Sequence, residues 1–152
     1  MHNILKWDHR YLSMAKHIAH WSKDPSTQCG AVIVNEDNEI VSVGFNGLPR
    51  GVEDTQNRLH DRTLKYAMTI HAERNAILFA RQSLKNCTMY TWPLPMCCEC
   101  AVMAIQAGIA KHVTMHTDNE RWIDSIEHTH QLCSEAGVQI VEYDTLIEQD
   151  QK

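Results

Sequence analysis

The chain contains no long apolar run. None of its 152 residues lies in a segment near the roughly 20 apolar residues that a membrane-spanning helix needs. The amino-terminal residues 1–8 lack the basic-then-apolar order of a secretory signal peptide. No internal repeat and no low-complexity tract occurs. These absences predict a cytoplasmic protein with no membrane partner.

Basic residues are in the minority. Fourteen Lys and Arg residues stand against nineteen Asp and Glu residues, which gives a net charge of -5. A protein that binds long nucleic acid through many phosphates needs a positive rather than a negative net charge. One or two local cations can still hold a single phosphate. The charge therefore argues against a long nucleic acid as partner and leaves a small anionic substrate open.

The length and apolar content predict a single domain over residues 1–152, because 43% hydrophobic residues can fill one core in a chain of this size. Apolar periodicity predicts helices over about 7–24, 71–79, 97–108 and 120–135. It predicts strands at 31–34, 40–45, 88–92, 111–115 and 138–141, with a long loop over 46–69. The first two strands should form a hairpin, and alternating strands and helices predict parallel pairs further on. The expected α/β fold is a mixed five-stranded sheet with helices on its faces.

Six cysteines are present in a chain for which we expect a reducing compartment, where clustered cysteines more often bind metal than form disulfides. Cys97 and Cys100 lie three positions apart and so share one helical face. Cys98 is an alternative ligand, but it would pair with Cys100 at a poorer spacing. We therefore favour Cys97 and Cys100 as a metal-binding pair.

His71 completes a set of three zinc-type ligands with Cys97 and Cys100, which leaves the fourth tetrahedral position for water. Glu73 is then free to act as a general acid and base. The two residues point to opposite sides of a regular helix, so they converge only if His71 lies at an irregular helix start. A structural zinc site is the alternative, but it needs a fourth ligand, and no second His or Cys follows His71 at a suitable spacing. The H-x-E and C-x-x-C pattern is typical of zinc deaminases.

Four runs carry a family resemblance that spans residues from about 8 to 142. They are Ser-Lys-Asp-Pro at 22–25, Gly-Phe-Asn-Gly-Leu-Pro-Arg-Gly at 44–51, His-Ala-Glu-Arg-Asn-Ala-Ile at 71–77 and Cys-Cys-Glu-Cys-Ala at 97–101. The chain resembles the deoxycytidylate deaminases of the cytidine deaminase-like superfamily. The resemblance implies a three-layer α/β/α sandwich and a zinc-dependent conversion of dCMP to dUMP with release of ammonia.

The resemblance also assigns roles to individual positions. It implies zinc binding by His71, Cys97 and Cys100, proton transfer by Glu73, base contacts from the Ala72 backbone, a sugar contact from Asn46, and phosphate contacts from Lys23 and Arg50. Two other interpretations stay open. One is deamination of another nucleoside, base or modified cytosine nucleotide, and the other is a non-catalytic zinc-binding or nucleotide-binding regulatory module.

Members of this family are commonly homo-oligomers, often hexamers, and they respond to dCTP and dTTP. The resemblance therefore implies that this chain forms a homo-oligomer, with dCTP and dTTP as possible effectors. Two positions depart from the family pattern. Met96 stands directly before Cys97, where the family has proline. Phe45 replaces a tyrosine and so lacks its hydroxyl, which weakens the inference on regulation more than the inference on catalysis.

Overall fold

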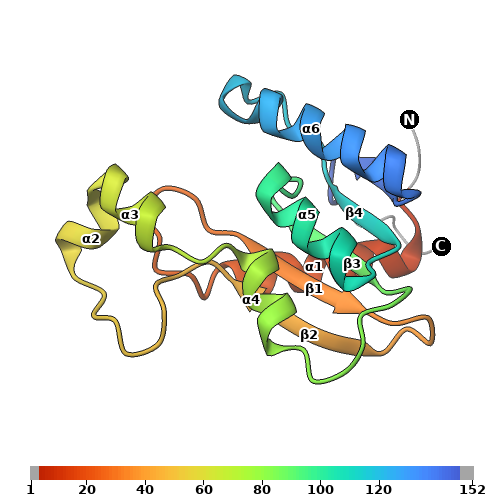
Figure 1. Cartoon of the computed structure of the whole chain (residues 1–152), viewed down its shortest axis with the longest axis horizontal. Helices are drawn as coiled ribbons and strands as arrows, with labels where there is room; N and C mark the ends of the chain where they lie inside the picture. The colour runs from red at the N-terminus through yellow and green to blue at the C-terminus, as the bar shows by residue number, and fades with distance from the viewer. Residues whose placement is uncertain (1–3, 148–152) are drawn as a thin grey trace.

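The computed structural model describes residues 4–147, shown in Figure 1. The ends of the predicted domain, residues 1–3 and 148–152, lie outside the described residues. One five-stranded sheet has the strand order β2-β1-β3-β4-β5. The strands are β1 (Gly30–Val34), β2 (Ile40–Phe45), β3 (Thr88–Trp92), β4 (Lys111–Met115) and β5 (Gln139–Tyr143). The helices are α1 (Lys6–Ala19), α2 (Gln56–His60), α3 (Arg62–Met68), α4 (Ala72–Phe79), α5 (Cys98–Ala107) and α6 (Glu120–Ala136).

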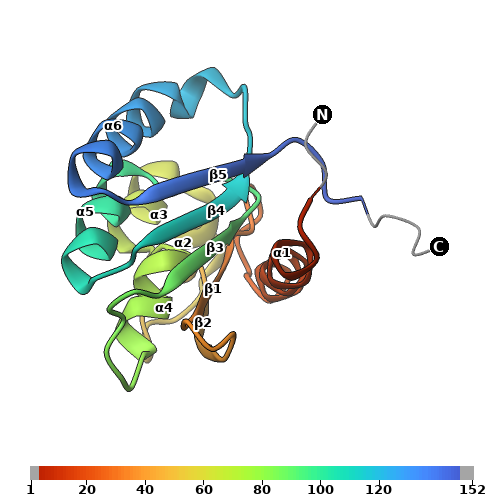
Figure 2. The ribbon, with the colours of Figure 1, turned by 90° about the vertical axis from the view of Figure 1, so that its right-hand side faces the viewer.

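Helices cover both faces of the sheet, so the fold has three layers. Figure 2 shows α1 alone on one face, with α4, α5 and α6 on the other. Strand β1 is buried on both faces because its side chains alternate: Val32 and Val34 pack in the α1 cluster, while Ala31 and Ile33 pack in the cluster that includes α4 and α5. The predicted three-layer α/β/α sandwich with a mixed five-stranded sheet is confirmed.

The strand directions also follow the prediction. Strands β1 and β2 form an antiparallel hairpin, and β3, β4 and β5 pair in parallel. Strand β1 joins the two parts by pairing antiparallel with β3. The segments that follow β3 and β4 therefore leave the same edge of the sheet, and both lead to helices that border the site described below.

Two predictions of local structure were wrong. Helix α1 ends at Ala19 rather than near residue 24, because polar side chains fold the next segment into turns: the Asp24 carboxylate accepts the N–H groups of Ser26 and Thr27. The predicted loop over 46–69 contains α2 and α3. Their starts are capped by the side chains of Thr55 and Asp61, each of which accepts the N–H group three residues further on.

Helix α4 lies unusually close to β2. A Cβ at Gly44 would clash with the carbonyl oxygen of Ala72, so only glycine allows this approach. An isolated bridge between Gly47 and Ile70 then brings the segment before α4 alongside the segment after β2. Together these contacts place the start of α4 at the edge of the sheet. Within residues 4–147, every helix is too short or too polar to cross a membrane.

Candidate active site

The three predicted metal ligands meet where α4 and α5 begin. His71 is the N-cap residue of α4, Cys97 is the N-cap residue of α5, and Cys100 lies in the first turn of α5. The His71 Nδ1 atom lies 3.2 Å from the Cys100 Sγ and 3.5 Å from the Cys97 Sγ. One ligand atom from each residue lies within 4.8 Å of the others. The structure thus brings together residues that are up to 29 positions apart in the sequence.

This geometry fits a zinc ion. Zinc binds nitrogen at about 2.0–2.1 Å and sulfur at about 2.3 Å, so tetrahedral coordination separates the two ligand atoms by roughly 3.6 Å. The observed nitrogen-to-sulfur distances are close to that value. One imidazole and two thiolates also match the borderline-soft character of zinc.

Arg74 supplies a second observation in favour of a bound cation with thiolate ligands. Its Nη2 atom donates to Glu99 Oε2 at 2.8 Å, but its buried Nε atom has no hydrogen-bond partner among the described residues. The sulfur atoms of Cys100 and Cys97 are close enough to interact electrostatically with the guanidinium. A thiolate held in the ionised state by zinc would give the Nε–H its acceptor.

The environment favours ionised sulfur. A hydrogen bond from the Cys100 thiol, together with one from His71, lowers the pKa of Cys97 to about 4, although burial opposes the shift. The same hydrogen bond, together with burial, raises the pKa of the Cys100 thiol. The Cys97 sulfur also accepts the Cys100 backbone N–H at 3.4 Å. The start of α5 is therefore a suitable place for negative charge.

Glu73 lies two residues after His71 and shares the same cavity. Convergence is possible because His71 has an extended backbone, with φ −66° and ψ 154°, and so precedes the regular helix. This is the irregular helix start that the sequence required. Glu73 is only 6% exposed, and burial raises the pKa of its carboxyl. A buried carboxyl beside a metal site is suited to accepting and returning protons.

The cavity is built from three parts of the chain. One is the segment between α1 and β1, and a second is the segment from α3 to the first turn of α4. The third comprises the residue that follows β2 together with residues that precede α5 and residues in the first two turns of α6. The lining residues are Asp24, Ser26, Thr27, Cys29, Asn46, Lys65, Tyr66, Thr69, His71, Ala72, Glu73, Leu94, Pro95, Cys97, Arg121, Trp122, Ser125 and Ile126. Ala72 and Asn46, for which the resemblance predicts contacts to the base and the sugar, both line this cavity.

The Asn46 side chain already makes two hydrogen bonds. Its Oδ1 accepts the Cys29 N–H at 2.8 Å, and its Nδ2 donates to the Thr27 carbonyl at 2.9 Å. Its own carbonyl accepts the Ser22 hydroxyl at 2.8 Å. Asn46 thus holds one wall of the cavity in place, and each amide atom keeps capacity for one further contact.

Lys23 and Arg50 do not line the cavity. Lys23 is 70% exposed and forms an ion pair with Asp54 at 2.7 Å, while the Arg50 guanidinium lies over the Phe79 ring at 4.7 Å. These contacts hold both side chains outside the cavity. The cavity instead contains Lys65, from α3, and Arg121, from the start of α6.

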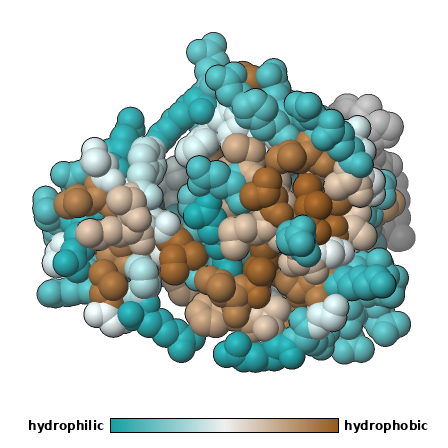
Figure 3. All heavy atoms as spheres, viewed as in Figure 1, coloured by the Kyte–Doolittle hydropathy of each residue, from teal (hydrophilic) through white to brown (hydrophobic). Residues whose placement is uncertain are grey.

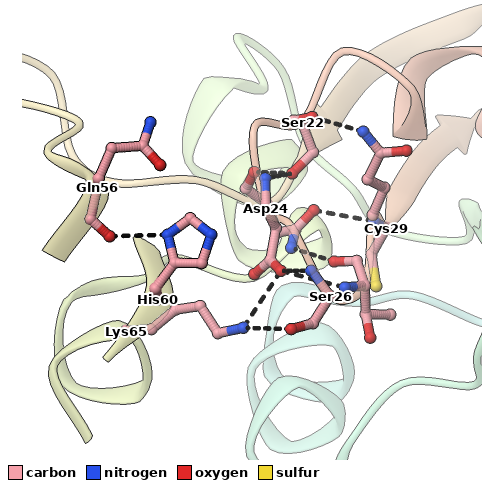
Figure 4. A network of polar contacts seen from close by, with 10 residues as sticks. Ser22, Asp24, Ser26, Cys29, Gln56, His60 and Lys65 are labelled. Atoms are coloured by element: carbon pink, nitrogen blue, oxygen red, sulfur yellow. Dashed lines mark hydrogen bonds and ion pairs between the residues drawn. The ribbon is translucent and has the colours of Figure 1, made fainter. Parts of the chain in front are cut away.

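Lys65 is part of a polar network that Figure 4 shows from close by. Its ammonium lies 3.2 Å from Asp24 Oδ1 and 3.2 Å from Ser26 Oγ, and the Lys65 and Asp24 side chains are only 11% and 10% exposed. Two of its three donors are used, so one remains. Arg121 is exposed at the cavity, with its guanidinium 5.3 Å from the Tyr66 ring centre and 4.8 Å from that of Trp122.

Sequence reasoning missed three of these basic residues. Lys65 is one of several charged residues in a segment that was expected to be a loop. Arg121 lies in a segment without a recognisable motif. Arg74 is a residue of the type expected on a solvated helix surface. The one sequence signal for Arg74 is that it directly follows the His-Ala-Glu motif at 71–73. For the other two, only the arrangement of α3 and α6 in space identifies the cavity as their position.

The chain is similar in sequence to known deaminases. Residues 5–116 match the family described as the cytidine and deoxycytidylate deaminase zinc-binding region. A deaminase from Aliivibrio fischeri, described as an uncharacterized deaminase in the luxG 3′ region, is 45% identical over 140 residues, which cover 90% of this chain and 93% of that protein. Human deoxycytidylate deaminase is 39% identical over 136 residues, which cover 84% of this chain and 72% of the human protein.

A solved structure supports the fold independently. The crystal structure of the dCMP deaminase from the cyanophage S-TIM5, in its apo form, aligns with a TM-score of 0.68. The alignment covers 93% of this chain and all of that chain, at 22% sequence identity. At this identity the likeness bears on the fold alone.

Proposed function

The chain belongs to the cytidine and deoxycytidylate deaminase family, and from this premise we propose that it is a zinc-dependent enzyme that deaminates dCMP to dUMP with release of ammonia. The observation that carries the proposal is that His71, Cys97 and the buried carboxyl of Glu73 line one cavity, and that the Cys100 sulfur lies within 4.8 Å of the His71 and Cys97 ligand atoms. Among the described residues, the cluster of metal-ligand atoms consists of His71, Cys97 and Cys100 and contains no carboxylate. Glu73 is therefore available for proton transfer.

We assign the metal to His71, Cys97 and Cys100. Zinc, when bound there, lowers the pKa of a water molecule toward neutrality and so supplies the nucleophile. Glu73 takes a proton from the attacking water and delivers it to the ring nitrogen, and it later protonates the departing amine. The balance is one water consumed and one ammonia released for each dUMP formed. Burial of Glu73 keeps bulk water from competing for these protons.

We further assign the substrate contacts within the cavity. The Ala72 backbone borders the base, and Asn46 retains one free hydrogen-bonding position on each amide atom for the sugar. Lys65 and Arg121 replace Lys23 and Arg50 as the residues proposed to bind the phosphate, because they are the Lys and Arg side chains found among the described lining residues. A phosphate near Lys65 would accept its third donor hydrogen.

The test is ammonia release by zinc-loaded protein from dCMP, deoxycytidine, cytidine monophosphate and cytosine in parallel. We expect the highest kcat/KM with dCMP, because only this substrate offers both the phosphate and the sugar without a 2′-hydroxyl. Turnover that is equal for dCMP and cytosine would contradict the proposed contacts. Turnover confined to another cytosine compound would retain the reaction class and overturn the substrate.

We also propose that the protein is a homo-oligomer, a hexamer by family resemblance. Apolar side chains are exposed at the end of β2 and on α4 and α5, and Figure 3 shows hydrophobic residues gathered on this face. They are Phe45, Leu78, Phe79, Val102 and Met103, which are 36–58% exposed. Such a surface is typical of a contact between subunits. A sedimentation profile with only monomer at micromolar concentration would contradict this proposal.

Regulation and location complete the proposal. We infer from the family resemblance that dCTP and dTTP are effectors of the enzyme. Kinetic assays with each nucleotide test this directly, and unchanged rates with both would overturn it. A cytoplasmic location agrees with six cysteines that are all free thiols in the structure, since a reducing compartment keeps them so. Cell fractionation with an antibody to the protein tests the location.

A further inference from the structure

Met96 occupies the position directly before Cys97 at which zinc deaminases of this pattern have proline. Proline has no backbone N–H, whereas methionine has one that needs an acceptor. Met96 has no exposed surface, so water cannot provide that acceptor. The substitution therefore creates a requirement for a protein acceptor beside the first cysteine ligand.

His112, on β4, meets this requirement. Its Nε2 atom lies 3.1 Å from the Met96 backbone nitrogen, and its Nδ1 atom lies 3.1 Å from the Met89 carbonyl oxygen. A carbonyl only accepts hydrogen bonds, so Nδ1 carries the proton and Nε2 is the acceptor for the Met96 N–H. The imidazole is fully buried, and burial lowers the pKa of His112 to about 4, which keeps it neutral near pH 7.

Two side chains of α6 bind the backbone next to Cys97. The Thr129 hydroxyl donates to the Met96 carbonyl at 2.9 Å, and the Ser125 hydroxyl accepts the Cys98 N–H at 3.0 Å. The backbone on both sides of Cys97 is thus attached to β4 and α6 by side chains. Cys97 contributes its sulfur from the N-cap position, where its carbonyl accepts the Ala101 N–H at 2.9 Å but its own φ and ψ are extended rather than helical.

We propose that His112 is a positioning residue for the zinc site, which replaces the missing proline by holding the Met96 N–H and so fixes the backbone that presents Cys97 to the metal. This inference rests on the proposed zinc-dependent function. Zinc–ligand distances are expected to lie within about 0.2 Å of their usual values, so the position of each ligand matters. Loss of the His112 contact frees the segment before Cys97 and places its sulfur less accurately, while His71 and Cys100 stay in place.

The test is a double-mutant cycle between positions 96 and 112, with metal affinity as its readout. His112→Val is made in the wild-type chain and in a Met96→Pro chain. Zinc affinity is measured by competition with a chelating dye, and cobalt binding by its thiolate-to-metal absorption. We expect His112→Val to weaken zinc binding at least about tenfold in the wild-type chain, and less than about threefold in the Met96→Pro chain, which has no N–H to satisfy.

Two further variants separate positioning from general destabilisation. His112→Gln keeps an acceptor and should retain zinc affinity within about threefold. Val113→Ala removes buried volume from the neighbouring residue, whose side chain packs in the α1 cluster, so it should lower the Tm and leave zinc affinity unchanged. If His112→Val does not fold, the inference requires that Met96→Pro restore both folding and metal binding.

Three results would overturn the inference. The first is wild-type zinc affinity in His112→Val, the second is equal weakening of zinc binding by His112→Val in both chains, and the third is weakened zinc binding in Val113→Ala. Failure of the proposed function looks different. In that case the wild-type protein itself binds no zinc or releases no ammonia, whatever residue stands at position 112.

Discussion

Substitution of Lys65 by methionine separates the two roles that the structure gives this residue. Methionine keeps much of the length and apolar character of the side chain but removes the ammonium. The buried Asp24 carboxylate then loses a cation at 3.2 Å, and the cavity loses a positive charge. The first effect acts on stability, and the second acts on the affinity for a phosphorylated substrate.

The expected sizes of the two effects follow from these contacts. Removal of one partner from a buried ion pair costs about 3–5 kcal/mol, but Asp24 keeps the N–H groups of Ser26 and Thr27 at 2.8 and 3.1 Å. We therefore expect a loss of about 2 kcal/mol in the free energy of unfolding, or roughly 4–8 °C in Tm. A lost hydrogen bond to phosphate is worth about 1.5–3 kcal/mol, which corresponds to roughly 10–100-fold in kcat/KM for dCMP.

The assay compares dCMP with deoxycytidine, which lacks the phosphate. Lys65→Met should reduce kcat/KM for dCMP and leave that for deoxycytidine nearly unchanged, so the ratio of the two cancels any loss of folded protein. Lys23→Met is the matched control, because Lys23 is 70% exposed and lies outside the cavity. It should change neither the ratio nor the Tm. Equal losses on both substrates in Lys65→Met, or a changed ratio in Lys23→Met, would refute the reasoning.

Two further predictions concern Arg74 and Tyr143. Arg74→Gln should weaken zinc binding about 10–100-fold in a chelator competition. Glu99→Gln removes only the exposed ion-pair partner of Arg74 and should change zinc affinity less than about threefold. Equal effects of the two substitutions would argue against a contact between Arg74 and the thiolates. Burial and a hydrogen bond to Asp8 raise the pKa of Tyr143 to about 12, whereas the pKa of a tyrosine in the unfolded chain is about 10. The contribution of Tyr143 to stability is therefore full below pH 10 and is lost as pH rises toward 12. Urea unfolding of Tyr143→Phe should therefore show a shallower decline over this range than wild type, and parallel declines would contradict the assignment.

Most of the fold could be predicted because its elements carry strong local signals. Helix α5 begins where Cys97 can cap it and ends at Gly108, whose φ of 102° suits glycine. Helices α2 and α3 were missed because each has fewer than eight residues, too short a span for apolar periodicity to show. Only their caps, Thr55 and Asp61, mark them in the sequence.

Some residues of the site could be predicted from short sequence segments, and others are identified only by the tertiary fold. His71, Cys97 and Cys100 could be predicted because the spacing of metal ligands on helix starts is a property of short segments. The position of Lys65 in the cavity could not, since Lys65 and Lys23 have the same chemistry and only the tertiary fold distinguishes them. A similar limit applies to His112, whose importance depends on a backbone N–H located 16 residues earlier.

The most direct measurement of the central claim is ammonia release from dCMP by the zinc-loaded protein beside its Glu73→Gln variant, with the zinc content of both determined. Wild type should form one ammonia for each dUMP. Glu73→Gln should bind zinc equally well and turn over about 10²–10⁴-fold more slowly, because it can no longer accept the proton. The account is contradicted if zinc-loaded wild type releases no ammonia from dCMP, or if Glu73→Gln retains the wild-type rate with zinc bound.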